Sequence, residues 1–534
     1  MDISGANLIG GSREAGTGPS FRAVDPATGD ALAPVFHDAD LAQTDRAAVA
    51  AGLAFRRFAG CPATTRAEFL RAIADELEGA AGAIVPRAQA ETGLPQMRIE
   101  NELKRTTGQL LLFARLVEEG SWVDARIDRA DPTRTPAPRP ELRRMLQPIG
   151  PVAVFGASNF PLAFSVAGGD TTSALAAGCP VVVKAHPAHP GTSEIAAFAV
   201  ARAARRAGLP EGVFNLLHGS NPDVGLSLVR HPAVAAVGFT GSLTAGRALF
   251  DAAAAREIPI PVFAEMGSLN PLFLLPGAVA ARGSLLAQGA AAAVTIGVGQ
   301  FCTKPGLIIL EGGQPAREFL GALASALGAT PVGTMLTARI SDRYHAGLER
   351  AREVLGVQSL TTGINPGAAT RTSATTRAGS ALLATDAQTF LHTPQLSEEI
   401  FGPTVLAVVC SDRSELLTVA ATLEGHLTAA VHGEAEELSL YGDLIALLRA
   451  RVGRLIWNGY PPGVEVSPAM HHGGPYPATT DARFTSVGTA AIQRFARPIC
   501  FQDFPEEALP PELQAANPRG ILRLVDGLPT RDPR

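Results

Sequence analysis

The sequence predicts an α/β protein that contains an open parallel sheet. Short runs of β-branched residues at 149–155, 179–185, 213–219 and 233–242 alternate with helical stretches. Strands that alternate with helices in this way are typical of parallel sheets joined by crossover helices. With 534 residues the chain is also too long for one ordinary core, so we expect two or three domains. We expect the sheet within residues 149–262, with helices on both faces.

The regions around this sheet carry other patterns. Residues 21–36 alternate apolar and polar positions around turn residues, which predicts a hairpin. Residues 39–120 repeat apolar side chains at helical spacing and predict helices. Residues 127–141 are rich in proline and charge, which favours an exposed connector or a protruding arm. A second α/β region is expected from about 262 to 456, before a proline-rich tail at 505–534.

Composition limits the class of partner. The net charge is −5, from 45 Lys and Arg against 50 Asp and Glu. Such a chain has no overall positive field to hold nucleic acid, so we expect a small-molecule substrate and no nucleic-acid partner. No basic region followed by an apolar run opens the sequence, and the most apolar later stretches are broken by Pro, Gly or polar residues, so neither a signal peptide nor a membrane span is predicted.

The cysteines and histidines argue against disulfides and against a metal. Five cysteines are odd in number and widely scattered, which favours a reducing compartment and a cytoplasmic protein. The pairs His186/His189 and His471/His472 lack a third ligand at any metal spacing. We therefore expect no metal site.

One cysteine, Cys302, lies in GVGQFCTKPG (297–306) between glycines and a proline-glycine exit. Glycines allow a substrate to approach the backbone closely, and a thiolate is a strong nucleophile, so the stretch suits a covalent catalyst. The alternative is a buried structural cysteine, which burial statistics alone favour.

Two further residues suit the same chemistry. Glu265, in AEMGSLNP, has an apolar, glycine-flanked setting in which a carboxylate can accept a proton from a thiol or a water. Taken alone, it is more often a surface or salt-bridged residue. Asn159, in FGASNFPLAF, could donate its amide to an oxyanion together with the Cys302 N–H, although a lone Asn before a helix is more often a cap.

A nucleotide site is expected at the carboxyl ends of the first strands. GFTGSLTAG (238–246) ends a strand and opens a helix, so its backbone amides suit a pyrophosphate. Lys184 ends another strand, where its ammonium could reach a ribose, although an exposed lysine at a strand end is the plainer interpretation.

These motifs, together with SEEIFGP (397–403), resemble in content and order those of the aldehyde dehydrogenase family. The resemblance implies oxidation of an aldehyde to an acid with NAD or NADP. It implies that Cys302 is the nucleophile, Glu265 the general base and Asn159 an oxyanion donor.

The resemblance also assigns the cofactor residues. It implies that the phosphate loop and the SEEIFGP motif face the nucleotide, and that Lys184 binds the adenosine ribose. The implied residues are Gly241, Ser242 and Gly246 near the phosphates, Glu399 at the nicotinamide ribose and Phe401 near the ring.

The same resemblance implies a domain plan and an oligomer. We expect a Rossmann-type nucleotide-binding domain from 1–126 and 149–262, and an α/β catalytic domain from 263–456. An oligomerisation arm and C-terminal segment would comprise 127–148 and 457–534. Exposed strands of such an arm would otherwise be open edges, so we expect a homodimer or homotetramer.

Longer phrases such as FAEMGSLNP and HGGPYPATTDARFTSVGT are similar to the branch that oxidises 2-oxoglutarate semialdehyde. Departures from the wider family are Ser268, Leu269 and Lys304. Three alternatives remain: a broad NADP-dependent medium- or long-chain aldehyde dehydrogenase, a catalytically silent structural homologue, and a cofactor-free thioesterase. Intact Cys302, Glu265 and Asn159 argue against the silent homologue.

The choice between the nucleotides depends on the residue three positions after Lys184. Family members strict for NAD commonly carry a Glu there, which repels the 2′-phosphate of NADP, whereas this chain has Pro187. Asp223, in the next loop, opposes the same phosphate. We therefore expect both nucleotides to be used, with a lean to NADP.

Overall fold

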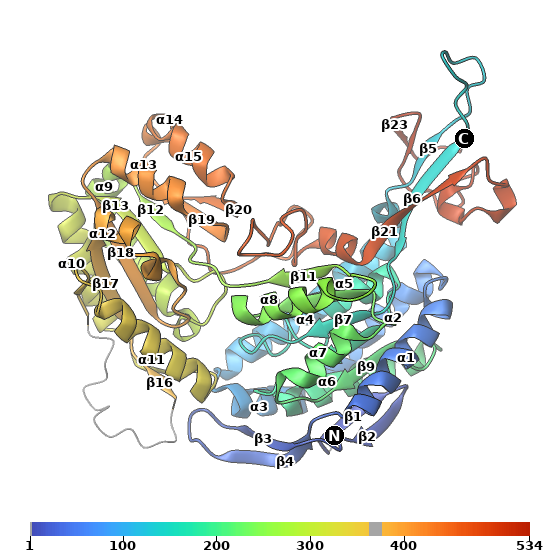
Figure 1. Ribbon diagram of the computed structural model, residues 1–534, viewed down its shortest axis with the longest axis horizontal. Helices are drawn as coiled ribbons and strands as arrows, with labels where there is room; N and C mark the ends of the chain where they lie inside the picture. Colours follow the sequence, from blue (N-terminus) through green and yellow to red (C-terminus); the bar gives the residue numbers. More distant parts are fainter. Residues whose placement is uncertain (1–2, 362–375, 534) are drawn as a thin grey trace.

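The computed structural model describes residues 3–361 and 376–533. Two seven-stranded sheets form two lobes, and a five-stranded sheet forms an arm that projects from one of them (Figure 1). The first lobe has the order β11-β10-β7-β8-β9-β1-β2, in which the five strands from β11 to β9 are parallel. Its strands are β1 (Ala6–Ile9), β2 (Ser12–Ala15), β7 (Val152–Phe155), β8 (Val181–Lys184), β9 (Phe214–Leu217), β10 (Ala236–Thr240) and β11 (Val262–Glu265).

Alternate residues of these parallel strands face opposite helical layers. In β8, Val181 and Val183 belong to one buried cluster and Val182 to another, so both faces of the strand are covered. Parallel strands covered on both faces read as continuous apolar runs, which is why the runs were visible in the sequence. The helices of this lobe are α1 (Leu41–Phe58), α2 (Ala63–Gly79), α3 (Ala81–Thr92), α4 (Gln96–Glu119), α5 (Gly169–Ala177), α6 (Pro190–Arg206), α7 (Pro222–Arg230) and α8 (Leu243–Ala254).

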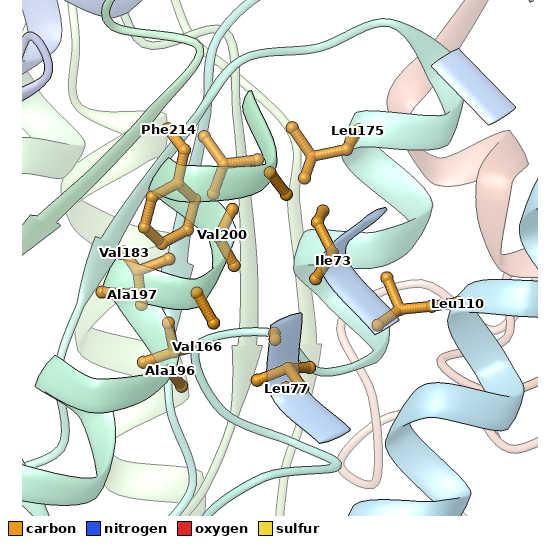
Figure 2. Packing of buried hydrophobic residues seen from close by; sticks show 14 of the residues in the cluster. Ile73, Leu77, Leu110, Val166, Leu175, Val183, Ala196, Ala197, Val200 and Phe214 are labelled. Atoms are coloured by element: carbon orange, nitrogen blue, oxygen red, sulfur yellow. The ribbon is translucent and has the colours of Figure 1, made fainter. Parts of the chain in front are cut away.

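The larger cluster joins α2, α4, α5 and α6 to the sheet. Figure 2 shows Ile73 and Leu77 of α2 beside Leu110 of α4, with Val200 of α6 between them and Phe214 of β9. All five side chains are nearly inaccessible to solvent. Truncating one such side chain to alanine typically costs about 2–5 kcal/mol, so this cluster fixes where α4 lies relative to the sheet.

The second lobe repeats the plan with the order β15-β17-β18-β13-β12-β19-β20, parallel except for β15. Its strands are β12 (Leu272–Leu274), β13 (Leu307–Glu311), β15 (Gln358–Ser359), β17 (Ala381–Asp386), β18 (Thr404–Cys410), β19 (His426–His432) and β20 (Val452–Trp457). Its helices are α9 (Pro276–Thr295), α10 (Gln314–Gly328), α11 (Ala338–Arg352), α12 (Ala387–His392), α13 (Arg413–Thr422), α14 (Glu437–Leu440) and α15 (Gly442–Arg449).

Helix α9 is the one helix of the described chain that is long and apolar enough to cross a membrane, a feature that the sequence analysis did not single out. It packs Leu286, Ala290 and Val294 against the second sheet, and 39% of its most apolar window is buried. It is thus a partly buried core helix that packs against the sheet of the second lobe.

The arm is a mixed sheet of order β21-β6-β5-β22-β23. Its strands come from two distant parts of the chain. Strands β5 (Arg126–Asp128) and β6 (Leu142–Pro148) directly precede β7 in the sequence, whereas β21 (Ala496–Gln502), β22 (Arg523–Val525) and β23 (Leu528–Thr530) lie near the C-terminus. The N-terminal hairpin of β3 (Ser20–Val24) and β4 (Ala31–His37) runs below the first lobe, and β14 (Gly333–Thr334) pairs with β16 (Arg377–Ala378) (Figure 1).

Candidate active site

Cys302 lies in a tight turn between the lobes, after a short 3₁₀ segment, Ile296–Gly299, and before β13. Gly297 and Gly299 have φ of 56° and 66°, and a Cβ on Gly299 would lie 2.3 Å from the backbone of Gly402. The side-chain amide of Asn270 donates to the carbonyls of Cys302 (2.8 Å) and Lys304 (3.0 Å). The turn is therefore fixed on both sides of the thiol.

Two side chains, Glu265 and His472, converge at the thiol. Glu265 ends β11, and its Oε1 lies 3.1 Å from Nε2 of His472, while the same Nε2 lies 3.6 Å from Sγ of Cys302. The Sγ of Cys302, a carboxylate oxygen of Glu265 and a ring nitrogen of His472 all lie within 4.8 Å of one another. Ser486 donates its hydroxyl to Oε2 of Glu265 (2.7 Å). Because an ionised carboxylate can only accept, the His472 contact needs a proton on Nε2.

The pKa values of Glu265 and Cys302 are shifted in opposite directions. Burial acts to raise the pKa of Glu265, but the charge and hydrogen bond of His472 and the hydroxyl of Ser486 outweigh it, so that pKa lies below its usual value. Burial raises the pKa of the Cys302 thiol well above its usual range; Glu265 adds to this rise and Arg105 opposes it. The resting form is thus a thiol beside a carboxylate.

Asn159 follows β7 and reaches the same turn. Its Nδ2 donates to the carbonyl of Gln300 (2.9 Å), two residues before Cys302. The ring of the next residue, Phe160, packs edge-on against Phe164 and Phe301, with centroids 5.3 and 5.2 Å apart. The amide therefore lies beside the nucleophile turn, where its second N–H is available for an oxyanion.

The predicted phosphate loop lies at the start of α8. Ser242 is the N-cap and its Oγ accepts from the N–H of Ala245 (3.3 Å), while Gly241 donates to the carbonyl of Glu265 (3.0 Å). A Cβ on Gly241 would lie 2.6 Å from the Phe239 ring, and one on Gly246 would lie 2.7 Å from Met266. The glycines are thus required by packing, and the exposed first turn presents backbone N–H groups that suit a phosphate.

Lys184 ends β8 below a loop that a buried aspartate holds. Asp38 accepts from the N–H and hydroxyl of Ser220 and from the amide of Asn221 (2.6, 3.0 and 2.9 Å). Burial lowers the pKa of Lys184 to about 8, and Asp38 opposes this change. With a pKa of about 8 the amine is still mostly protonated at neutral pH, so it can donate to a ribose hydroxyl.

Glu399 and Phe401 lie on the second lobe, on the other side of the thiol. A Cβ on Gly267 would lie 2.6 Å from Oε2 of Glu399, so the carboxylate packs against the segment that follows Glu265. Burial raises the pKa of Glu399 to about 7, and Lys304 opposes it. Nζ of Lys304 donates to the carbonyls of Ile400 (3.3 Å) and Thr404 (2.9 Å). Phe401 is half-buried between these two anchors.

His472 and Ser486 were not predicted from the sequence. There, His472 is only half of a histidine pair without a third metal ligand nearby in the chain. The structure supplies partners from 170 and 207 residues away, Cys302 and Glu265, and this cluster could hold a metal ion. Spacing along the chain could not show it, because the segment 472–486 reaches the site only by packing against β11, through a bridge between Thr479 and Glu265.

Comparisons with known proteins show which family the chain resembles. The model of the aldehyde dehydrogenase family matches residues 13–475. The chain is 50% identical over 528 residues to alpha-ketoglutaric semialdehyde dehydrogenase 2 of Azospirillum brasilense, and the match covers 99% of both chains. It is 42% identical over 530 residues to alpha-ketoglutaric semialdehyde dehydrogenase of Acinetobacter baylyi, again over 99% of both.

A solved structure shows the same fold. Lactaldehyde dehydrogenase of Escherichia coli superposes with a TM-score of 0.80 over 93% of this chain and 98% of that chain, at 21% identity. This confirms the predicted α/β fold class. Taken with the family match and the full-length relatives, these findings show that the chain belongs to the aldehyde dehydrogenase family and is an NAD(P)-dependent aldehyde dehydrogenase.

Proposed function

We propose that the protein oxidises 2-oxoglutarate semialdehyde to 2-oxoglutarate through a covalent intermediate on Cys302. The observation that carries the chemistry is the convergence of a thiol, a carboxylate and an imidazole within 4.8 Å between the two lobes. The substrate is supported by the two full-length relatives, since alpha-ketoglutaric semialdehyde is another name for this compound.

The first step forms a carbon–sulfur bond. The Cys302 thiol shares a hydrogen bond with Glu265, which takes its proton, and the Nε2–H of His472, 3.6 Å from Sγ, then faces the thiolate. Attack on the aldehyde carbon places negative charge on the former carbonyl oxygen. The amide of Asn159 and the backbone N–H of Cys302 are the groups proposed to hold that oxyanion.

The second step breaks the thioester that Cys302 holds after loss of a hydride. Glu265 first returns its proton to solvent and then removes a proton from a water, which attacks the acyl carbon and releases the acid and the Cys302 thiolate. His472 and Ser486 orient the carboxylate for this step, because each donates to a different oxygen of Glu265 (3.1 and 2.7 Å).

Residues of both lobes fit a dinucleotide. The exposed first turn of α8 suits the phosphates, Lys184 a ribose, and Glu399 with Phe401 the nicotinamide end. When bound, the nicotinamide supplies the hydride acceptor. We propose that both nucleotides are used with a lean to NADP, because Pro187 leaves no carboxylate at the position three residues after Lys184.

We also propose a cytoplasmic homodimer or homotetramer assembled through the arm. Strand β21 is an edge of the arm sheet and is mostly exposed along its seven residues. An unpaired edge of this kind is a template for a second chain, and pairing between copies would remove it. Light scattering that shows only monomer across micromolar concentrations would overturn this part.

The substrate is tested with a panel of aldehydes in a nucleotide-reduction assay. We expect the highest kcat/KM with 2-oxoglutarate semialdehyde, above succinic semialdehyde, pentanal and octanal. A clear preference for octanal would instead support the broad medium- or long-chain activity. Running each aldehyde with NAD and with NADP measures the nucleotide preference in the same assay.

A further inference from the structure

Helix α4 presents a charged face towards the nucleophile. Arg98, Glu102 and Arg105 are spaced so that they lie on one side of the helix. Glu102 is buried; its Oε1 accepts from the N–H groups of Leu162 and Ala163 (both 2.9 Å), and its Oε2 accepts from Arg98 (2.6 Å). This carboxylate therefore fixes α4 to the loop that follows Asn159. That contact places Arg98 and Arg105, on the same face of α4, at the site.

Arg105 lies against the aromatic wall of the site. Its guanidinium is 5.7 Å from the centre of the Phe164 ring, and that ring is 6.4 Å from the ring of His472. Nη1 donates to the carbonyl of Val464 (2.7 Å), while Nε is buried without a hydrogen-bond partner. Arg105 is close enough to the thiol to act against the rise in the pKa of Cys302.

Arg454, on β20, reaches the same segment from the second lobe. Its guanidinium donates to the carbonyls of Gly463 (3.1 Å) and Pro461, and its Nε is also buried without a partner. Burial lowers the pKa of Arg454, and the charge of Cys302 opposes this change. Arg105 and Arg454 therefore hold residues 461–464 between them, and the charge of each interacts with Cys302.

These two cations lack a protein anion. Among residues 3–361 and 376–533, no carboxylate lies within ion-pair distance of Arg105 or Arg454. Glu102 is committed to Arg98 and to two backbone N–H groups, and Glu465 is exposed. Arg98 adds a third guanidinium, 4.4 Å from the Phe160 ring, with one buried and unpartnered Nη2. All three arginines are half-buried, and a buried N–H of a cation without a partner is costly unless an anion joins it.

We infer that Arg105 and Arg454, with Arg98 at the neighbouring wall, bind the distal carboxylate of the aldehyde substrate. The inference rests on the proposed function, in which the substrate carries a carboxylate at the end opposite the aldehyde. Guanidinium groups bind carboxylates through directed, charge-assisted hydrogen bonds, and the aromatic rings between them and Cys302 suit the methylene chain. The same site disfavours an uncharged aldehyde, which would leave the guanidiniums unpaired.

The test compares two aldehydes of equal chain length, 2-oxoglutarate semialdehyde and pentanal, in Arg105→Met and Arg454→Met. We expect the ratio of kcat/KM for the semialdehyde to kcat/KM for pentanal to fall about 10- to 150-fold, the range for a lost charged hydrogen bond. Pentanal reports the loss that each substitution causes through the pKa of Cys302 alone. Arg105→Lys should recover part of the loss, because charge is kept without the planar fork. Arg115→Met, on an exposed position of α4, is the matched control and should leave both substrates unchanged.

Inhibition of pentanal oxidation by glutarate separates this inference from the proposed function. Glutarate should inhibit the native enzyme, and both arginine substitutions should weaken that inhibition. If the native enzyme shows no preference for the semialdehyde, the proposed substrate fails, while the subsite still stands on the glutarate result. Equal losses with both aldehydes, or glutarate inhibition that neither substitution changes, would overturn the subsite.

Discussion

Two glutamates, Glu265 and Glu399, flank Cys302, and they differ in what surrounds them. Glu265 receives hydrogen bonds from His472 and Ser486, and its pKa lies below the usual value although burial acts to raise it. Glu399 has the more distant charge of Lys304 and a backbone hydrogen bond from Ser268, and burial raises its pKa to about 7. The number of donors, rather than the depth of burial, therefore decides which carboxylate is ionised at neutral pH.

The largest expected effect concerns the thiol that lies between the two glutamates. Cys302→Ala should abolish aldehyde oxidation and leave nucleotide binding largely intact, because the proposed role is on the substrate. Steady-state assays and nucleotide titration by fluorescence measure the two properties separately. A loss of only a few-fold in turnover would remove Cys302 from the mechanism.

Substituting each glutamate in turn tests the comparison directly. Glu265→Gln should slow steady turnover by about 10²–10⁴, the usual contribution of a general base, and thioester hydrolysis should slow more than hydride transfer. A burst of reduced nucleotide should then appear in stopped-flow traces. Glu399→Gln should act mainly on the KM for the nucleotide. Equal effects of the two substitutions on hydrolysis would contradict the proposed division of roles.

Removing the imidazole should make Glu265 behave like Glu399. In His472→Asn, burial is no longer opposed by the histidine, so the pKa of Glu265 should rise. A carboxylate with a raised pKa is lost as a base at higher pH, so the acid limb of the kcat profile should move to higher pH. At neutral pH we expect about a 10- to 150-fold loss for one charged hydrogen bond. His471→Asn, on the adjacent histidine, is the control, and a limb that does not move would contradict the role of His472.

A smaller effect is expected at Lys304, whose charge keeps the pKa of Glu399 from rising further. In Lys304→Met that pKa should rise above about 7, so Glu399 would be mostly neutral at neutral pH. The KM for the nucleotide should increase several-fold and recover partly at higher pH. Lys104→Met, at an exposed position, should leave the KM unchanged. A KM that is independent of pH in Lys304→Met would separate Lys304 from Glu399.

The smallest effect is expected from a substitution that adds a carboxylate near Lys184. Pro187→Glu places an acid three residues after Lys184, where it should repel the 2′-phosphate of NADP. The ratio of kcat/KM for NADP to that for NAD should fall. If the native protein already proves strictly dependent on NAD, Pro187 does not set the preference.

Local patterns predicted much of the fold and part of the site. The parallel strands β7 to β10 were visible because both of their faces are buried, which makes them continuous apolar runs. Cys302, Glu265 and Asn159 stood out through their motifs. Strands β1 and β2 at one end of the sheet were not foreseen, since β1 pairs antiparallel with both of its neighbours and the edge strand β2 is mostly exposed.

The residues that the sequence did not reveal are those that depend on distant packing. His472 has no local signal, because its partners lie 170 and 207 residues away. Arg105 and Arg454 are likewise linked by hydrogen bonds to residues 461–464, which join one lobe to the other. Helical periodicity showed that Arg105 lies on α4, but no periodicity shows which loop will cover that face.

The late position of His472 in the chain has a consequence for synthesis. A ribosome adds His472 170 residues after Cys302, which takes roughly 10–30 s at common translation rates. During that interval the nascent chain carries the cysteine without its imidazole neighbour and without the hydroxyl of Ser486. The acid–base cluster is therefore completed only after the second lobe has been made, so a partly synthesised chain carries an unfinished reactive centre.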